Sequence, residues 1–95
     1  MRFEWAPDKA RRNLAKHAVP FELAKLVFDD PLHLLVPDRV EEGQQRWHAI
    51  GMVGAVAILL VVHAYPDPDD EELVRIIGAR KATPHERRRY EQEAT

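Results

Sequence analysis

The segment VAILLVVH, residues 56–63, most limits what this chain can fold into, because it is apolar at nearly every position. A strand with one face in water alternates apolar and polar residues, and this segment has almost no polar face. Such a strand has to lie in the middle of a sheet and be covered on both sides. The longest apolar run, residues 55–62, is too short to cross a bilayer, for which about 20 residues are needed. Since the first residues also lack an apolar signal core, we expect a cytoplasmic protein with no membrane association.

The segments around this strand predict an α+β fold in a single domain over residues 1–95. Strands that follow one another, rather than alternate with helices, indicate a small and mainly antiparallel sheet. Two amphipathic helices with a tight break at Val19-Pro20 predict a helical hairpin on one face of that sheet. The capping signature Thr83-Pro84-His85-Glu86 starts a C-terminal helix. In chain order we expect a strand at 2–5, helices at 8–17 and 20–28, strands at 33–37, 46–52, 56–63 and 73–80, and a helix at 84–93.

Charge is distributed unevenly, although the formal net charge is only −2. Five acidic residues crowd the predicted loop at residues 67–72, whereas residues 73–89 carry six Lys or Arg against the single acid Glu86. One interpretation is a solvated acidic loop followed by a solvated helix. The other is a local positive field that attracts an anion, which a net charge cannot reveal.

The last predicted strand, residues 73–80, carries Arg75 among apolar residues. If the strand is regular, the residues on either side of Arg75 enter the core and Arg75 lies on the opposite, open face. Arg80 has the opposite parity, so both arginines line one site only if the strand twists or ends near Ala79. An open face with Arg75, Arg80 and Lys81 suits a phosphate group. The structural alternative is an ion pair between Arg75 and an acid on the next strand.

The five histidines offer a second chemistry, a metal site. His17, His48 and His63 can meet in space, but none of the spacings typical of metal-binding motifs is present. The chain has no cysteine, which excludes disulfides and Cys-ligated zinc. His17 at a helix end and His63 at the end of a buried strand also suit structural roles. We therefore expect neither a metal nor a cofactor.

Several short segments, in the same order over nearly the whole chain, resemble the BrnT family of toxins from bacterial type II toxin–antitoxin pairs. They are FEWAPDKARRNLAKHAVPFELAKLVFDDP, QRWHAIG, LLVVH, RIIGARKAT and ERRRYE. The resemblance implies a fold like that of RelE-type ribonucleases, with a small sheet and two helices on one face. It also implies action on RNA that blocks translation. The implied partner is a BrnA-type antitoxin with a ribbon-helix-helix domain, which alone would contact operator DNA.

Four positions depart from the family pattern. Ala6 stands where an aspartate is usual, and Ala18 replaces a glycine, so these two changes concern turns and caps. Gly78 replaces a serine. Gln44 and Gln45 stand before Arg46 where an acidic residue is usual, so if that carboxylate serves as a base elsewhere in the family, the base is absent here.

The resemblance explains the positive strand as part of a metal-independent endoribonuclease site. Such a reaction needs the 2′-hydroxyl deprotonated, the phosphate charge stabilised and the leaving 5′-oxygen protonated, and arginine suits the second task. The expected catalytic residues are Arg75, Arg80 and Lys81, with His48 or His17 as proton carrier. The expected substrate-binding residues are Arg46, Arg87 and Tyr90.

Two other functions remain compatible with these residues. The first is a non-catalytic module whose basic face binds only the antitoxin, or operator DNA within a complex. The second is a metal-dependent hydrolase built on the histidines. Cleavage of RNA by the free protein distinguishes the first from a ribonuclease, and sensitivity to a chelator would reveal the second.

Overall fold

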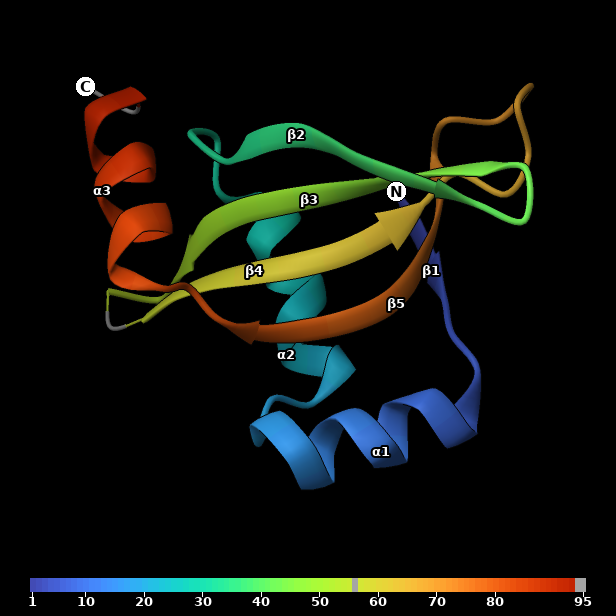
Figure 1. Ribbon diagram of the computed structural model, residues 1–95, viewed down its shortest axis with the longest axis horizontal. Helices are drawn as coiled ribbons and strands as arrows, with labels where there is room; N and C mark the ends of the chain where they lie inside the picture. Colours follow the sequence, from blue (N-terminus) through green and yellow to red (C-terminus); the bar gives the residue numbers. More distant parts are fainter. Residues whose placement is uncertain (56, 94–95) are drawn as a thin grey trace.

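The computed structural model describes residues 1–55 and 57–93, which form a twisted sheet with helices at one face, one edge and one end (Figure 1). The elements are β1 (Arg2–Glu4), α1 (Pro7–His17), α2 (Phe21–Ala24), the 3-10 helix η1 (Lys25–Asp29), β2 (Leu34–Glu41), β3 (Gln44–Val53), β4 (Ala57–Ala64), β5 (Leu73–Lys81) and α3 (Pro84–Glu93).

The sheet has the strand order β1-β5-β4-β3-β2, so the apolar strand β4 is central, as its sequence predicts. The neighbours of β4 are both antiparallel to it, and only the short β1 pairs in parallel, with β5. Leu59, Leu60 and Val61 are at most 2% exposed, which confirms that β4 is covered on both faces over its centre. Val56, the first residue of the predicted strand, lies outside the described residues.

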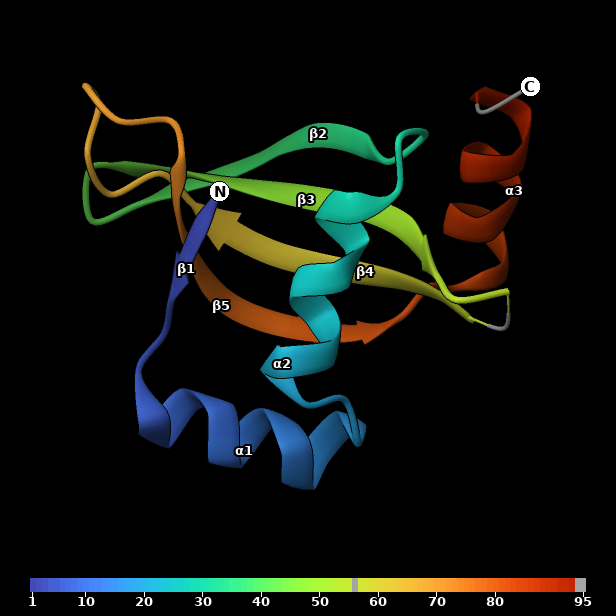
Figure 2. The same cartoon turned by 180° about the vertical axis from the view of Figure 1, so that it is seen from behind.

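One face of the sheet, here called the helix face, packs against α2 and η1 (Figure 2). Phe21 and Val27 from these helices are buried with sheet residues such as Val61 and Ile76. Phe28 is partly buried against this cluster. The opposite face, here called the open face, is covered at one end by α3, where Tyr90 packs against the sheet.

The helical hairpin differs from the prediction. The segment 20–28 forms only a short α-helix, α2, and continues as the 3-10 helix η1. Helix α1 matches its predicted range but lies along the edge of the sheet beside β5 (Figures 1 and 2). None of its eleven residues, all of them described, is fully buried, and Leu14 is 49% exposed. Its apolar residues therefore bury too little area to bring the helix over the face.

Residues 38–45, which separate the predicted strands at 33–37 and 46–52, form no long loop but continue the β2–β3 hairpin. Both strands extend to a turn at Glu42 and Gly43, which have φ angles of 51° and 75°. A register shift between Pro37 and Val40 interrupts the pairing. Pattern analysis misses this hairpin because its exposed end carries polar side chains on both faces, which leaves no alternation to detect.

Asn13 attaches α1 to the sheet through two hydrogen bonds and makes a third to Val19. Its side-chain amide donates to the carbonyl oxygens of Ala79 (2.9 Å) and Val19 (3.0 Å), and its Oδ1 accepts the backbone N–H of Ala79 (3.0 Å). The short β1 pairs only with residues 73–75 of β5, which leaves the later part of β5 without a strand on that side. Asn13 therefore takes the place of a neighbouring strand at Ala79.

His63 is a core residue of the helix face, fully buried in β4. Its ring packs edge-on against Phe28 with centroids 4.9 Å apart, and its Nε2 lies 3.3 Å from the Tyr65 hydroxyl. Burial disfavours the charged imidazolium and lowers the pKa of His63 to about 4. This placement agrees with the structural role that its sequence position suggests.

We predict that restoring the two helix caps of α1 stabilises the protein. Ala6 is the N-cap and has no side-chain hydrogen bond, and Ala18 ends the helix with a φ of 58°, where a Cβ is unfavourable. Ala6→Asp and Ala18→Gly should each raise the free energy of unfolding by about 1 kcal/mol. Urea denaturation measures this, with Ala15→Gly, which has no capping role, expected to destabilise by a similar amount.

We predict that His63 makes the fold sensitive to mild acid. Its folded pKa lies below its unfolded value, so the unfolded chain binds the proton first and stability falls as the pH drops from about 6.5 to about 4. The loss should reach roughly 3 kcal/mol. Unfolding curves across this range should show a shallower pH dependence for His63→Gln than for the exposed control His85→Gln. Equal slopes for both variants would contradict this assignment.

Candidate active site

A β-bulge in β5 determines which side chains reach the open face. On β4, Val62 pairs with Gly78 of β5, and the next residue, His63, pairs with Ile76. Ile77 therefore has no partner on β4 and is the extra residue of the bulge. Ile76 faces the helices, and Arg75 therefore lies on the open face. Arg80 pairs with Leu60, whose side chain packs with α3 on the same open face. In a regular strand, residues 75 and 80 would face opposite sides of the sheet. The extra residue shifts the alternation by one, so both arginines lie on the open face.

Both arginines are held by carboxylates. Arg75 donates to Glu4 on the adjacent strand β1, with Nε and Nη2 at 2.7 and 2.6 Å from Oε2. Arg80 forms a bidentate pair with Glu86 of α3, at 2.7 and 3.0 Å. The ion pair between Arg75 and Glu4 matches the structural alternative to phosphate binding, an ion pair with an acid on the next strand. Each guanidinium keeps at least one nitrogen outside these bonds, Nη1 in Arg75 and Nε in Arg80, and each side chain is partly exposed.

Glu86 links the arginine to the start of α3. Its Oε1 also accepts the backbone N–H of Thr83 (2.9 Å), and the Thr83 hydroxyl accepts the N–H of Glu86 (3.2 Å), which confirms the predicted capping box. The hydrogen bond from Arg80, together with those from Thr83, outweighs burial and lowers the pKa of Glu86 to about 2. The carboxylate thus stays ionised and holds the Arg80 guanidinium in place.

His48 and Arg46 occupy the open face on β3. His48 pairs across the sheet with Val62, and its Nε2 lies 3.2 Å from a carboxylate oxygen of Asp38 on β2. Arg46 pairs with Glu41, with Nη1 and Oε2 separated by 2.5 Å. A histidine oriented by a carboxylate is a common arrangement for proton transfer. His48, Val62 and Gly78 form one lateral row, and two strand spacings of about 4.8 Å separate His48 from Gly78.

Two predicted site residues lie elsewhere. Lys81 pairs with Leu59 and therefore points to the side of β5 opposite Arg80, as an exposed residue. His17 lies at the end of α1, in a groove between that helix and Ile77 of β5. The open face therefore carries Arg75, Arg80, Arg46 and His48, whereas His17 and Lys81 face other surfaces.

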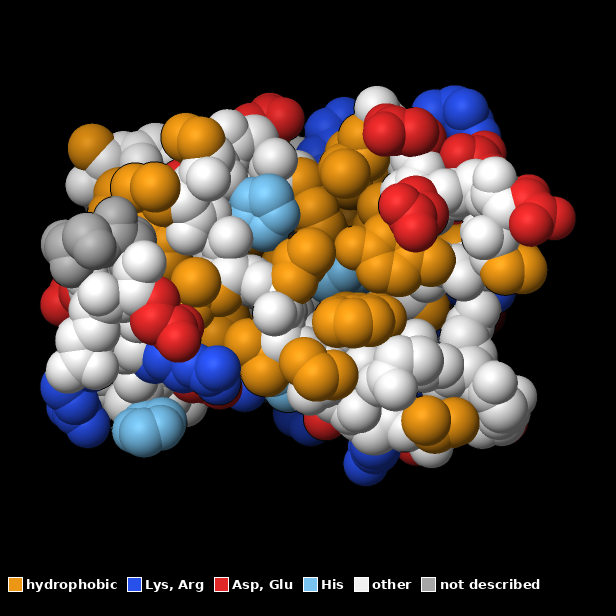
Figure 3. Space-filling view, turned by 90° about the horizontal axis from the view of Figure 1, so that it is seen from above, with side chains coloured by type: hydrophobic (Ala, Val, Ile, Leu, Met, Phe, Trp, Pro, Cys, Tyr) orange, Lys and Arg blue, Asp and Glu red, His pale blue; other side chains and the backbone are white. Residues whose placement is uncertain are grey.

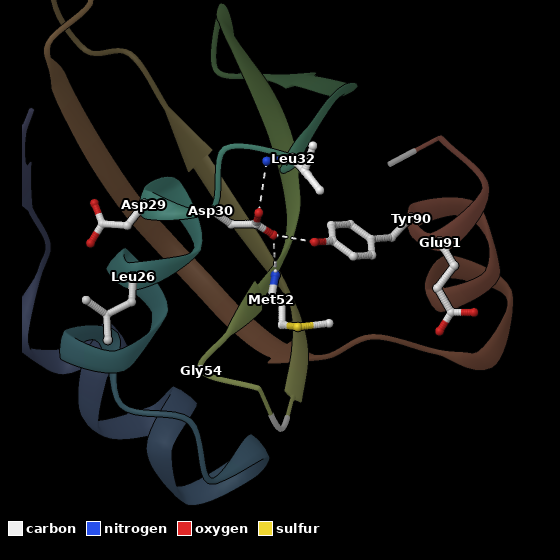
Figure 4. A pocket seen from close by; sticks show the side chains of 8 residues that line it. All are labelled: Leu26, Asp29, Asp30, Leu32, Met52, Gly54, Tyr90 and Glu91. Carbon is white, nitrogen blue, oxygen red and sulfur yellow. Dashed lines mark hydrogen bonds between the residues drawn. The ribbon is translucent and has the colours of Figure 1, made fainter. Parts of the chain in front are cut away.

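Tyr90 anchors α3 to the sheet (Figure 4). It is 5% exposed, and its hydroxyl donates a 2.5 Å hydrogen bond to Asp30. The same carboxylate accepts the backbone N–H groups of Leu32 and Met52, at 2.9 and 2.8 Å. Burial, together with the bond to the charged Asp30, raises the pKa of Tyr90 to about 12. Arg87, on the same helix, is exposed.

Asp38, Glu4 and Glu86 are the functional neighbours that sequence reasoning does not assign to the site. Glu86 has a recognisable capping signature, but its second bond to Arg80 follows from the fold alone. Asp38 falls in the misassigned loop. Gln45 donates to the backbone oxygens of Asp38 (2.6 Å) and Arg46 (2.7 Å). Its amide therefore holds the irregular hairpin that presents Asp38 to His48.

The acidic end of the molecule does not suit phosphate. Viewed from above, hydrophobic side chains occupy the middle of the surface and acidic ones gather at the right-hand side (Figure 3). A hollow there is lined by Leu35, Trp47 and Tyr65 together with acids of the β4–β5 loop, among them Asp67 and Glu71. Its charge repels phosphate, so a nucleic acid is directed toward the other surfaces.

Metal-ligating side chains do not gather in the described part of the chain: no three of His, Asp or Glu are grouped closely enough to hold an ion. The described residues contain no helix that is long and apolar enough to span a membrane.

The family model described as ribonuclease toxin, BrnT, of type II toxin–antitoxin systems matches residues 5–86. The chain belongs to this BrnT family of ribonuclease toxins. It is similar to the Brucella abortus ribonuclease toxin BrnT, known from a crystal structure, with 28% identity and a TM-score of 0.66. That match covers 87% of this chain and 97% of the other. No curated protein matches this chain.

We predict that Tyr90 serves the fold rather than the reaction. Tyr90→Phe removes the hydrogen bond to Asp30 and should lower the free energy of unfolding by about 1.5–3 kcal/mol, the usual contribution of a hydrogen bond to a charged group. RNA cleavage per folded molecule should stay within a few-fold of the wild type. Circular dichroism with an RNase assay measures both quantities. A normal melting temperature with lost cleavage would assign Tyr90 to the substrate.

Proposed function

We propose that this toxin is a metal-independent endoribonuclease that cuts RNA on the open face of its sheet and thereby inhibits translation. Membership of a ribonuclease toxin family supports RNA as the substrate. The observation that carries the proposal is the bulge at Ile77, because it brings Arg75 and Arg80 to the same face as His48. Such an activity acts where RNA is translated, in the cytoplasm.

In this reaction the two arginines bind the scissile phosphate through the nitrogens that their carboxylate partners leave free. His48, oriented by Asp38, takes the proton from the 2′-hydroxyl. The 2′-oxygen attacks the phosphorus and the bond to the 5′-oxygen breaks, which gives a 2′,3′-cyclic phosphate and a 5′-hydroxyl. Solvent supplies the proton to the leaving oxygen. Arg46 and Arg87 flank this face and contact neighbouring phosphates.

The partner that neutralises the toxin is, in this proposal, a BrnA-type antitoxin with a ribbon-helix-helix domain. It covers the open face with acidic side chains, and operator DNA is contacted only by the antitoxin. Charge complementarity makes such an association faster and salt-dependent. Adding the antitoxin should therefore suppress RNA cleavage.

Cleavage by variants of the arginines tests the proposal. Arg75→Ala and Arg80→Ala should each lower cleavage by about 10²–10³, the scale of losing one preorganised donor at a transition state. Arg88→Ala, on the outer side of α3, should change it little. A chelator should leave cleavage intact, and the product should carry a cyclic phosphate. Cleavage that is abolished by the chelator would favour the histidine-based hydrolase instead.

Glu4→Gln and Glu86→Gln are the matched controls, because each breaks an ion pair and keeps the arginine. If the arginines act only as structural partners, these variants reproduce the loss of stability seen in the arginine variants, and activity per folded molecule is unchanged throughout. If the arginines bind phosphate, the glutamine variants keep most of the cleavage and the alanine variants do not. Melting temperatures accompany each assay.

The competing function is a non-catalytic module that uses the open face for binding. The ion pairs of Arg46, Arg75 and Arg80 favour it, since they leave less free positive charge for a substrate. It predicts that the purified protein binds the antitoxin and leaves RNA intact. The cleavage assay therefore decides between the two functions.

A further inference from the structure

Helix α1 carries a row of cations that the cleavage site does not use. Lys9, Arg12 and Lys16 are exposed and recur at intervals of three and four residues, so they share one flank of the helix. Among the described residues, no carboxylate forms a salt bridge with any of the three, and Arg12 contacts only the backbone oxygen of Asp8 (3.4 Å). Arg11, on the opposite flank, is paired with Asp8. The positive charge is therefore uncompensated on one side of α1 alone.

This row borders a continuous groove between α1 and the outer edge of β5. One part of the groove is lined by the three cations together with Asn13, His17 and Ile77. The adjoining part is lined by Lys9, Ile77 and Arg75, among others. Because Lys9 and Ile77 line both parts, the groove runs from Arg75 of the open face over the bulge and along α1.

The groove is held in a fixed shape by the contacts of Asn13. The three hydrogen bonds of its side chain tie the middle of α1 to Ala79 of β5 and to Val19. The cations thus project from a helix whose position against the sheet is defined. A ligand that contacts all three does not have to order the helix itself, which reduces the entropic cost of binding.

We propose that this groove, here called the α1 track, binds the phosphate backbone of single-stranded RNA that extends from the cleavage site. This inference rests on the proposed function, since it places the scissile phosphate at Arg75 and Arg80. Lys9 and Lys16 are about 10 Å apart along the helix axis, from a rise of about 1.5 Å per residue. Phosphates of one strand in a duplex are spaced by about 3.4 Å along the axis, so the track spans two or more nucleotides. Contacts of this kind are independent of base sequence.

The test replaces the three cations together, as Lys9→Gln/Arg12→Gln/Lys16→Gln. The matched control, Arg11→Gln/Lys25→Gln/Arg88→Gln, removes the same charge from residues outside the track. The probe is a dodecanucleotide of mixed sequence with every 2′-hydroxyl methylated, which cannot be cleaved. Binding is measured as a function of salt concentration, and circular dichroism confirms folding.

The track variant should bind this RNA about tenfold more weakly than the control at physiological salt, and its log–log salt slope should fall by about 2, since each contact to a single strand contributes about 0.7. With a cleavable dodecanucleotide, KM should rise and kcat should stay unchanged. Cleavage of a dinucleotide, which cannot reach α1, should be the same in all three proteins.

Equal RNA binding by the track variant and the control would overturn the proposal. If, in addition, only the track variant loses the antitoxin, the track is a protein-binding surface. If the wild type binds the methylated RNA through the track but cleaves no RNA, the proposed function fails and the α1 track stands. If the wild type cleaves RNA and the track variant matches the control, the track fails and the proposed function stands.

Discussion

Ile77 enters β5 as an extra residue opposite the step from Val62 to His63, and the arrangement of the open face depends on this irregularity. On its N-terminal side, Ile76 packs against the helices and Arg75 faces outward. On its C-terminal side, Ala79 packs against the helices and Arg80 faces outward. A regular strand would bury one of the two arginines or turn two apolar residues into water, and either change costs several kcal/mol. The bulge lets one strand supply both a core and a pair of outward cations.

The carboxylates on the open face give the arginines fixed positions. Glu4 and Glu86 each hold a guanidinium in one orientation, which lowers the entropy that a bound phosphate would otherwise have to remove. They also reduce the net charge of the face, so that binding there depends on a geometric match between donors and phosphate oxygens more than on long-range attraction. In the proposed function, the unpaired cations of α1 would provide the long-range field instead. Positioning and attraction of the RNA would then fall to different elements of the toxin.

The sequence predicts the parts of the fold that follow from periodicity and capping. The central position of residues 57–63 follows from their apolar run, and the start of α3 follows from Thr83 and Glu86. Residues 38–45 do not alternate, so neither the hairpin extension nor Asp38 is detectable beforehand. The bulge leaves no local signal either, because Ile77 is as apolar as its neighbours. The individual arginines could be named as candidates, but their shared face and their carboxylate partners depend on tertiary contacts.

Asn13 occupies a place that in most sheets belongs to another strand. Beyond residue 75, the outer side of β5 is not covered by β1, and one amide side chain pairs with the backbone of Ala79 there. An uncovered strand edge is a template on which a second chain can add by backbone pairing, and it promotes aggregation. The protection of this strand edge therefore depends on the docking of a helix that has no fully buried residue. Conditions that detach α1 would favour self-association of the protein well before they unfold its core.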